Sequence, residues 1–294
     1  MSVPPVQART VLVTGCSSGI GAATALFLRE AGWQVLPTAR KPDDLDALRA
    51  QGFAPIALDV ADAASAEAAA REIRERTGDR LGALVNNAGF CQAGAMEDVS
   101  RDALRAQFET NVFGAHQLTC ALVPVFRRQG YGRIVNVGSI LGRMSAPMLG
   151  AYCASKFALE ALSDALRIEL RNTGVWVALV EPGAILSRFR RNAAEALDRT
   201  VDRSRSGFGD VYAHEIERRR RQVKKQDLFT RPPEEVARKI LHALESPRPR
   251  RRYRVTLPAH LAEFAARFIP QAWTDPLLAR RVPERSPRPA EGAP

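Results

Sequence analysis

The 294-residue sequence has no apolar run close to the roughly 20 residues that a bilayer-spanning helix needs. Its first residues, MSVPPVQAR, lack the apolar core of a secretory signal peptide. The four cysteines, at positions 16, 91, 120 and 153, have no metal-like spacing, so we expect no metal and a reducing, cytoplasmic location. Aromatic residues make up 6% of the chain and do not alternate with its basic clusters, which argues against a base-stacking surface for nucleic acid.

The net charge of +11 comes from the last third of the chain. Residues 1–187 contain 18 Lys and Arg against 18 Asp and Glu, whereas residues 188–294 contain 25 against 14. The basic clusters are Arg218–Arg221 with Lys224 and Lys225, Arg248–Arg254, and Arg280–Arg281. The excess is either solvated surface with a basic tail or a surface that attracts anions, such as acidic lipid head groups or an acidic carrier protein. No nucleic-acid-binding motif accompanies it, so we expect no nucleic-acid partner.

Short apolar segments alternate with amphipathic helices along most of the chain, which predicts an α/β fold of the Rossmann type. We expect a doubly wound parallel sheet of about seven strands, in the order 3-2-1-4-5-6 plus a final strand, with helices on both faces. The predicted strands are 10–14, 34–38, 54–58, 83–86, 133–137, 175–180 and 253–257. The predicted helices are 20–31, 63–77, 101–128, 151–172 and 233–245.

Tyr152 and Lys156 are four residues apart and share one face of a predicted helix. An ammonium one turn from a phenol favours the phenolate, so we expect Lys156 to lower the pKa of Tyr152 and make a general acid/base. By itself this spacing also fits an exposed helical face that happens to carry both residues. Ser139, which follows the predicted strand 133–137, would stand at the carboxyl end of that strand, where open α/β sheets bind ligands.

The segment Thr14–Gly21, TGCSSGIG, joins the first predicted strand to the first predicted helix. A strand, a glycine-rich turn and a helix together place a pyrophosphate on the helix N-terminal amides. Gly15 permits the tight turn, Gly19 lets the backbone approach the phosphates, and Gly21 lets the helix pack closely. This turn together with Ser139, Tyr152 and Lys156 predicts a dinucleotide-dependent enzyme.

These residues resemble the short-chain dehydrogenase/reductase family across about residues 8 to 187, with the motifs in the family's order. Asn86–Gly89 resembles the element that ends the fourth strand, and Asn111 the asparagine that holds a water in the proton relay. Asp59 resembles the acid that bonds the adenine amino group. Pro182–Gly183 resembles the dipeptide that closes the nicotinamide pocket, after which Ser187 is the nearest hydroxyl where the family usually has a threonine. The residues within the motifs resemble those of the 17β-hydroxysteroid and retinol dehydrogenase branch and its bacterial relatives.

The resemblance implies that Asn111, Ser139, Tyr152 and Lys156 are catalytic, and that Lys156 also bonds the nicotinamide ribose. It also implies a dimer or tetramer, because family members often assemble through the helices near 101–128 and 151–172. The expected cofactor-binding residues are Gly15, Ser17, Ser18, Gly19, Ile20, Gly21, Arg40, Lys41, Asp59, Val60, Asn87, Ala88, Gly89, Tyr152, Lys156, Pro182, Gly183 and Ser187.

The end of the second predicted strand indicates which nicotinamide cofactor is used. An NAD-binding chain would place an acid there, but this sequence has Arg40 and Lys41 instead. A guanidinium fork suits a phosphate dianion, and Ser17 or Ser18 could add a hydrogen bond, so we predict NADP(H) over NAD(H). The alternative for Arg40 is a surface salt bridge.

Leu141, Met144, Met148, Leu149 and Phe189 are apolar residues near the expected site. They suggest a lipophilic carbonyl or alcohol as substrate (an aldehyde, steroid, retinoid or fatty-acyl derivative), unless they belong to the core. A catalytically silent NADP(H) sensor is the alternative function, although such proteins typically lose the Tyr or the Lys.

We divide the chain into a catalytic domain at 1–257 and a C-terminal helix and tail at 258–294. Residues 187–230 are polar and charged, occupy the place of the family's substrate lid, and have a composition that predicts mobility with few side chains to bury. Residues 261–269 form an apolar-faced helix, read either as a core or dimer contact or as an interfacial membrane helix beside basic residues. The composition of 283–294 predicts disorder.

Overall fold

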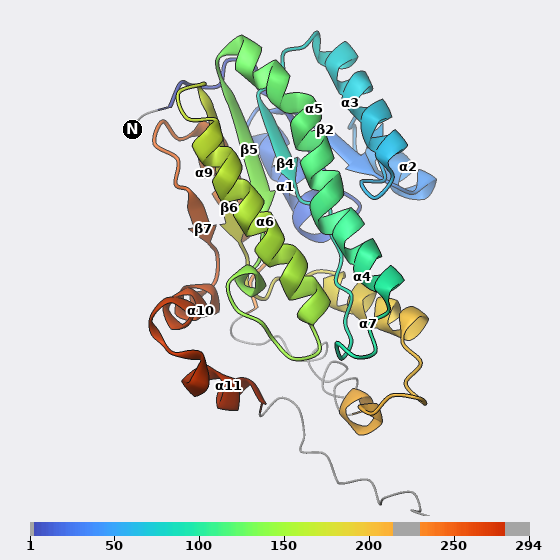
Figure 1. Ribbon diagram of the computed structural model, residues 1–294. Helices are drawn as coiled ribbons and strands as arrows, with labels where there is room; N and C mark the ends of the chain where they lie inside the picture. The colour runs from blue at the N-terminus through green and yellow to red at the C-terminus, as the bar shows by residue number, and fades with distance from the viewer. Residues whose placement is uncertain (1–2, 214–229, 280–294) are drawn as a thin grey trace, which may run out of the picture.

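The computed structural model describes residues 3–213 and 230–279, which are built around one sheet of seven parallel strands (Figure 1). The strand order is β3-β2-β1-β4-β5-β6-β7, which confirms the predicted Rossmann-type topology. The strands are β1 (Thr10–Val13), β2 (Gln34–Ala39), β3 (Ile56–Ala57), β4 (Ala83–Asn86), β5 (Gly132–Val137), β6 (Val175–Glu181) and β7 (Arg252–Arg254). Right-handed crossovers place the carboxyl ends of these strands along one edge of the sheet.

Helices cover both faces of the sheet, and two apolar cores lie between the layers. One core packs α1 (Gly19–Glu30), α2 (Pro42–Ala50) and α9 (Pro233–Glu245) on the sheet, and the other packs α3 (Ala63–Thr77) and α5 (Gly114–Gln129) beside α6 (Gly150–Glu169). Strand alternation divides the side chains between the two cores. In β1, Val11 and Val13 enter the first core and Leu12 enters the second.

The helix predicted at 101–128 is interrupted in the structure. It consists of α4 (Arg101–Phe108), a π-helical turn at Glu109–Phe113, and α5. A π-turn places one more residue in a turn than an α-helix does, so it does not change the apolar pattern enough to be read from the sequence.

The last strand, predicted at 253–257, is shorter in the structure. β7 ends at Arg254, and Thr256 instead begins α10 (Leu257–Phe268), because its side chain accepts a hydrogen bond from the Ala259 backbone N–H. A threonine at this position is a favoured helix N-cap, and this local hydrogen bond competes with strand extension. The chain then continues into α11 (Gln271–Ala279).

The segment predicted as a polar lid contains α7 (Phe189–Thr200) and buries more than its composition suggests. Leu197, Val201 and Tyr212 are almost fully buried and pack together. The Tyr212 hydroxyl donates to Asp98 (2.6 Å) and accepts from the Ala95 backbone N–H (2.8 Å). Residues 214–229 of the predicted lid, and the tail after Ala279, lie outside the described residues. Across the described ranges, we find no helix long and apolar enough to cross a membrane.

Candidate active site

Tyr152, Lys156 and Ser139 come together at the carboxyl end of β5. All three side chains are buried. Lys156 Nζ donates a hydrogen bond to the carbonyl of Val137 (2.8 Å) and lies 5.8 Å from the centroid of the Tyr152 ring. The Ser139 hydroxyl accepts from the Leu141 backbone N–H (3.1 Å). The predicted trio therefore forms one cluster, held between α6 and the carboxyl end of β5.

Burial, more than the lysine, sets the proton affinity of this cluster. Burial raises the pKa of Tyr152 above its ordinary value, although hydrogen bonding to Ser139 lowers it. Burial also lowers the pKa of Lys156 to about 8, against the opposing charge of Glu160. The pKa of Tyr152 is thus raised, where the sequence predicts that it is lowered, because removal of the phenolate from water has the largest effect.

Asn111 lies in the π-helical turn, where such irregular turns often mark functional sites. Its side-chain amide donates to the carbonyl of Phe90 (3.1 Å) and to the Ser155 hydroxyl (3.0 Å), and its oxygen accepts from the Phe90 backbone N–H (3.0 Å). Asn111 thus links the segment after β4 to α6, next to Lys156. Both amide protons are engaged, so only the side-chain oxygen keeps hydrogen-bonding capacity for a water.

The glycine turn has the backbone that its sequence predicts. Gly15 and Gly19 have φ values of 72° and 59°, a region in which only glycine is unstrained. A Cβ on Gly21 would lie 2.2 Å from the carbonyl oxygen of Gly15, so the helix packs against the turn only because this side chain is absent. The Asn87 side chain fastens the turn by donating to the carbonyls of Thr14 (2.8 Å) and Gly15 (3.2 Å).

The other expected cofactor-binding residues near the glycine turn contribute through packing and close backbone contacts. Ile20 packs on the core, Ala88 is in contact distance of Gly15, and Val60 is buried against Gly114. Gly89 lies beside Asn111, where a Cβ would be 3.1 Å from the side-chain oxygen.

Within the described part of the chain, the Ser18 side chain makes no capping hydrogen bond at the start of α1, although Ser18 is the N-cap residue. The first N–H groups of α1 are therefore left for an anion at the helix N-terminus. Ser17 is exposed at the same turn. This donor set fits the pyrophosphate of a dinucleotide.

Arg40 and Lys41 follow β2, which pairs with β1 beside the glycine turn. The Arg40 guanidinium lies 3.5 Å from the Asp59 carboxylate, and its side chain is 66% exposed. The alternative of a surface salt bridge is thus present in the structure. An exposed ion pair of this length contributes little, so it leaves Arg40 able to turn toward a phosphate. Asp59 also accepts from the Ala61 backbone N–H (3.1 Å).

Pro182, Gly183 and Ser187 lie on the opposite side, after β6. The Pro182 carbonyl accepts from the Ile140 backbone N–H (3.1 Å), which joins this segment to the loop of Ser139. A Cβ on Gly183 would meet the Thr256 hydroxyl at 2.1 Å. Ser187 touches the glycine turn, where a Cβ on Gly19 would lie 2.9 Å from its Cβ, and its hydroxyl accepts from the Phe189 N–H (3.3 Å).

Apolar side chains surround the phenol of Tyr152. Leu141, Leu149 and Phe189 pack with Tyr152, and the Phe189 ring meets the tyrosine ring edge-on at a centroid distance of 5.5 Å. Met148 packs in the adjoining cluster beneath α7. Met144 is half-buried, and no contact places it at the site. The sequence missed Cys91, which also packs on Tyr152.

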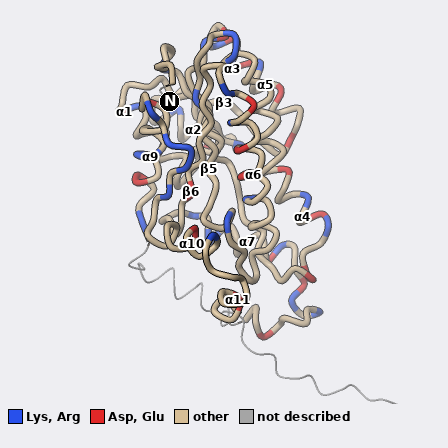
Figure 2. The backbone as a smooth tube through the Cα atoms, turned by 60° about the vertical axis from the view of Figure 1, so that its left-hand side comes forward, with Lys and Arg blue, Asp and Glu red and all other residues tan. Residues whose placement is uncertain are grey.

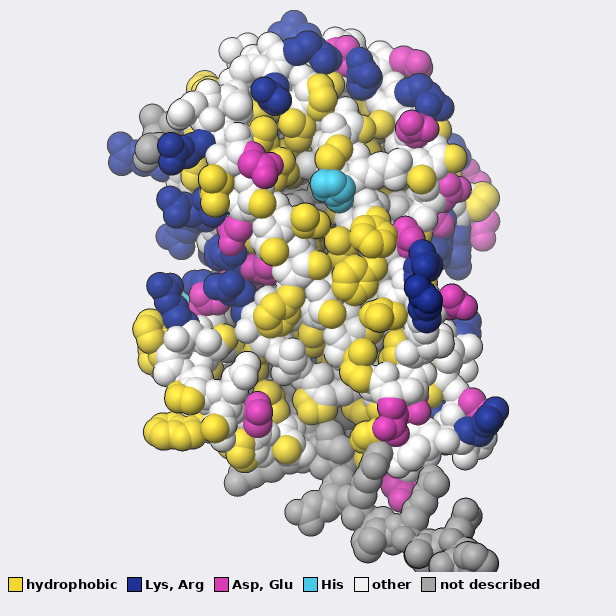
Figure 3. Space-filling view, in the orientation of Figure 1, with side chains coloured by type: hydrophobic (Ala, Val, Ile, Leu, Met, Phe, Trp, Pro, Cys, Tyr) yellow, Lys and Arg dark blue, Asp and Glu magenta, His cyan; other side chains and the backbone are white. Residues whose placement is uncertain are grey.

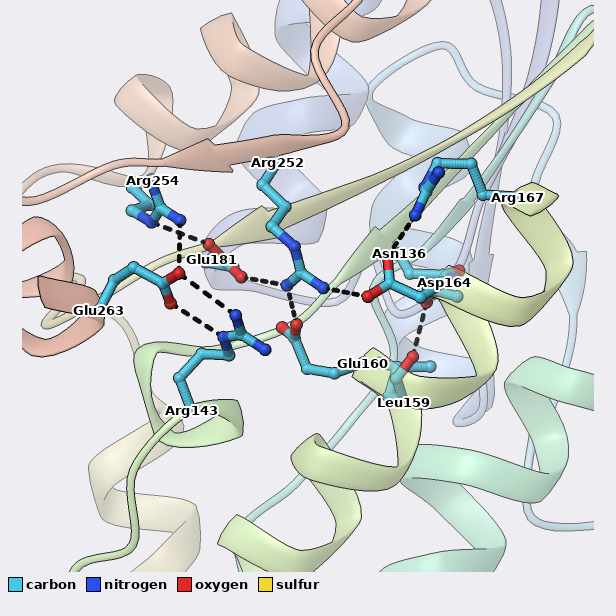
Figure 4. A network of polar contacts seen from close by, with 11 residues as sticks. Asn136, Arg143, Leu159, Glu160, Asp164, Arg167, Glu181, Arg252, Arg254 and Glu263 are labelled. Atoms are coloured by element: carbon cyan, nitrogen blue, oxygen red, sulfur yellow. Dashed lines mark hydrogen bonds and ion pairs between the residues drawn. The ribbon is translucent and has the colours of Figure 1, made fainter. Parts of the chain in front are cut away.

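A polar network behind the Ser139 loop was also missed (Figure 4). Arg252 of β7 forms ion pairs with Glu160 of α6, with Glu181 of β6 (2.7 Å) and with Asp164 (2.6 Å). Glu160 lies against the loop itself, since a Cβ on Gly138 or Gly142 would be 3.2 Å from its Oε1.

The network continues outward to α10. Arg254 pairs with Glu181 (3.4 Å) and with Glu263 of α10 (3.2 Å), and Glu263 also binds Arg143 (2.9 Å). These residues are far apart in sequence, so spacing could not reveal them. Over the described residues, no group of His, Cys, Asp and Glu side chains is placed to hold a metal ion.

Comparison with known proteins agrees with this geometry. A profile of the short chain dehydrogenase family matches residues 9–198. "Uncharacterized oxidoreductase YbbO" of Escherichia coli K12 is 40% identical over 274 residues, covering 93% of this chain and 95% of its own. Human "17-beta-hydroxysteroid dehydrogenase type 1" is 36% identical and covers 85% of this chain and 78% of its own. A solved short-chain dehydrogenase of Sphingobium yanoikuyae, in complex with NADPH, has a TM-score of 0.68 at 26% identity, covering 96% of this chain and 98% of its own.

Proposed function

Because the chain belongs to the short-chain dehydrogenase family, and is thus an oxidoreductase acting on CH–OH or C=O groups, we propose that it interconverts a lipophilic carbonyl compound and its alcohol with NADP(H). The observation that carries the proposal is the Tyr152 phenol, which meets Ser139 on one side and apolar side chains on the other. A phenol in this setting can exchange a proton with a bound substrate oxygen while water is kept away.

Ser139 and Tyr152 act on the substrate oxygen. In the direction of reduction, both hydroxyls would donate hydrogen bonds to the carbonyl oxygen, and Tyr152 would protonate the forming alkoxide. Donors that are already in place stabilise charge as it develops on that oxygen. A bound nicotinamide would supply the hydride. The raised pKa of Tyr152 keeps the phenol protonated before reaction, as an acid requires.

Lys156 would hold and recharge this acid. Its ammonium, fixed by the Val137 carbonyl, would stabilise the tyrosinate that remains after proton transfer. The free acceptor capacity of the Asn111 oxygen would hold a water that returns a proton toward Lys156.

The proposed cofactor residues are those predicted from the sequence, from Gly15 to Gly21, at Arg40 and Lys41, at Asp59 and Val60, at Asn87–Gly89 and at Pro182–Ser187. Arg40 supports NADP(H), because its exposed guanidinium stands where β2 ends without an acid to accept bonds from a ribose. An NADPH complex is also named for the relative from Sphingobium yanoikuyae.

We propose a lipophilic substrate: an aldehyde, a steroid, a retinoid or an acyl derivative. The apolar lining formed by Leu141, Leu149 and Phe189 supports this class, as does the substrate in the name of the human relative. Phe189 and α7 cover Tyr152, so α7 must move aside, or repack, for a bulky substrate to reach the phenol.

We also propose a cytoplasmic homo-oligomer, a dimer or tetramer, assembled through α5 and α6. Exposed apolar side chains on this surface support it: Phe113, next to α5, is 49% exposed, and Phe157 of α6 is 42% exposed. Figure 3 shows hydrophobic side chains gathered at the centre of this face.

The test is NADPH consumption with a panel of lipophilic aldehydes, ketosteroids and ketoacyl thioesters, with NADH in parallel. We expect turnover that depends on NADPH and falls by roughly two to four orders of magnitude in Tyr152→Phe, while NADPH affinity is largely kept. Near-normal turnover in this variant would refute the assignment of Tyr152. NADPH binding without turnover on any substrate would favour the silent sensor instead.

A further inference from the structure

The large apolar side chains of helix α10 face away from the domain, which is the reverse of the usual arrangement in a helix that only packs on its own domain. Its buried side chains are the small Ala259 and Ala262, whereas its large apolar side chains are exposed. These are Leu257, Leu261, Phe264 and Phe268, with exposures between 58% and 65%. Their spacing of four, three and four residues places them on one face of the helix. We call this the α10 stripe. Burying it against the domain would have released more free energy than burying alanines, so the stripe serves another contact.

Helix α11 extends this apolar surface. Trp273 is 73% exposed and Leu277 is 61% exposed. The rings of Phe264 and Phe268 pack against each other, with centroids 5.1 Å apart and planes tilted by 43°. Figure 3 shows these hydrophobic side chains grouped over α10 and α11, at the lower left of the molecule. Phenylalanine, leucine and tryptophan are the residue types that enter the boundary between lipid head groups and acyl chains.

The charges beside the stripe are basic. On the exposed side of α10 stand His260 and Arg267, and the Arg267 guanidinium lies over the Phe268 ring. The acid of this helix, Glu263, instead points to Arg143 and Arg254 of the domain. Arg280 and Arg281 follow α11 directly in the sequence, and Asp275 is the acid of α11. Figure 2 shows further Lys and Arg along the chain between α9 and α10. Of these, Arg252 and Arg254 are already paired in the polar network.

We propose that the α10 stripe, with Trp273 and Leu277, docks on an anionic lipid bilayer. The apolar side chains would enter the interface, and the arginines would meet the acidic head groups. A second copy of the chain would bring Arg267 of each copy together across a two-fold contact, which opposes close approach. Charge complementarity therefore favours the bilayer over self-association.

Ion pairs connect the docking surface to the active site. Glu263 binds Arg143, which ends the short helix after Ser139, and Arg254 connects Glu263 to Glu181 just before Pro182. A chain docked through α10 would hold the site close to the membrane, where a lipophilic substrate is concentrated. The docking itself does not depend on the proposed reductase activity, since its test measures binding and not turnover.

Trp273 provides a direct probe. Trp33 is buried in the core and Trp176 is half-buried, so Trp273 is the tryptophan that a membrane would desolvate. The full chain is titrated with phosphatidylcholine vesicles that either contain or lack phosphatidylglycerol, and fluorescence and flotation are recorded. We expect flotation and a blue shift with the anionic vesicles only, both weakened by salt, and no blue shift in Trp273→Phe.

The double variant Phe264→Ser/Phe268→Ser should lower the vesicle partition coefficient by more than about tenfold, because two apolar side chains no longer leave water. Met96→Ser is the control, since it removes an apolar side chain that is 53% exposed between β4 and α4 and should leave binding unchanged. Equal losses in both variants, binding that ignores lipid charge, or no binding at all would overturn the proposal. So would self-association in sedimentation experiments that the double variant abolishes, because that result would assign the stripe to a second copy.

Discussion

Arg252 is the side chain whose removal tests most directly how the polar network supports the site. Its side chain is 16% exposed, and its partners Glu160 and Glu181 are 5% and 2% exposed. In Arg252→Met these two carboxylates would lose the cation that lies between them, and Glu181 would keep only its 3.4 Å contact with Arg254. Breaking a buried ion pair by removing one partner costs about 3–5 kcal/mol of unfolding free energy. The contact with Asp164 adds little, because that side chain is 40% exposed.

The loss should depend on pH. Burial, with the charge of Glu181, raises the pKa of Glu160 from 4.5 to about 7 even with Arg252 present. The folded chain then binds more protons than the unfolded chain between these values, so the stability that protonated Glu160 contributes is lost as pH rises through about 7. Without Arg252 the pKa of Glu160 rises further. The variant is therefore expected to be most destabilised above pH 7 and less so at lower pH, where a protonated Glu160 no longer repels Glu181.

Denaturant unfolding of wild type and Arg252→Met at about pH 8.5 and about pH 5.5 measures this difference. Adding Glu160→Gln to the variant should recover much of the loss at the higher pH. Turnover should also fall, because Glu160 lies against Gly138 and Gly142 on either side of Ser139. An equal loss of stability at both pH values, or no recovery with Glu160→Gln, would refute the reasoning.

Three further predictions concern the proposed cofactor-binding residues and Lys156. Gly21→Ala should reduce NADPH affinity and destabilise the fold by about 1–3 kcal/mol, because its Cβ would meet the Gly15 carbonyl at 2.2 Å; calorimetric titration and denaturant unfolding measure both, and unchanged values would show that α1 shifts freely. Arg40→Ser should lower the ratio of kcat/KM for NADPH to that for NADH by roughly tenfold to a hundredfold, the contribution of a charge-assisted bond, and an unchanged ratio would remove Arg40 from the phosphate site. Lys156 has a pKa of about 8 in the folded chain, against its ordinary value of 10.5, so the folded chain binds fewer protons than the unfolded chain between these pH values. As pH rises through this window, the unfolding free energy of wild type should increase relative to that of Lys156→Met, by up to about 3 kcal/mol. A constant difference in unfolding free energy across the window would contradict the burial of a charged lysine.

The parts of the molecule that repeat a local pattern could be predicted from the sequence. The sheet order follows from alternating strands and helices, and the glycine turn from residues that need positive φ or close packing. The clustering of Ser139, Tyr152 and Lys156 follows from one helix face and one strand end.

What could not be predicted depends on contacts between distant segments. The pairing of Arg252 with Glu160 and Glu181 joins three elements, and no spacing encodes it. The sequence shows a lysine near Tyr152 but not the depth of burial, which raises the pKa of the phenol. The packing of Phe189 over Tyr152 likewise depends on how α7 folds back, which a polar composition concealed.

The π-helical turn at Glu109–Phe113 has a consequence for changes in chain length. It holds one more residue than the turn of an α-helix, so deleting a single residue there would restore a regular helix with its backbone ladder intact. Because the π-turn already absorbs the extra residue, the two halves of the helix would keep their relative orientation, and only the side chains of the turn itself would be redirected. Asn111 would be turned away from Phe90 and Ser155. The extra residue therefore directs Asn111 without changing the rest of the helix, so the chain should keep its fold after this deletion while the site loses the contacts of Asn111.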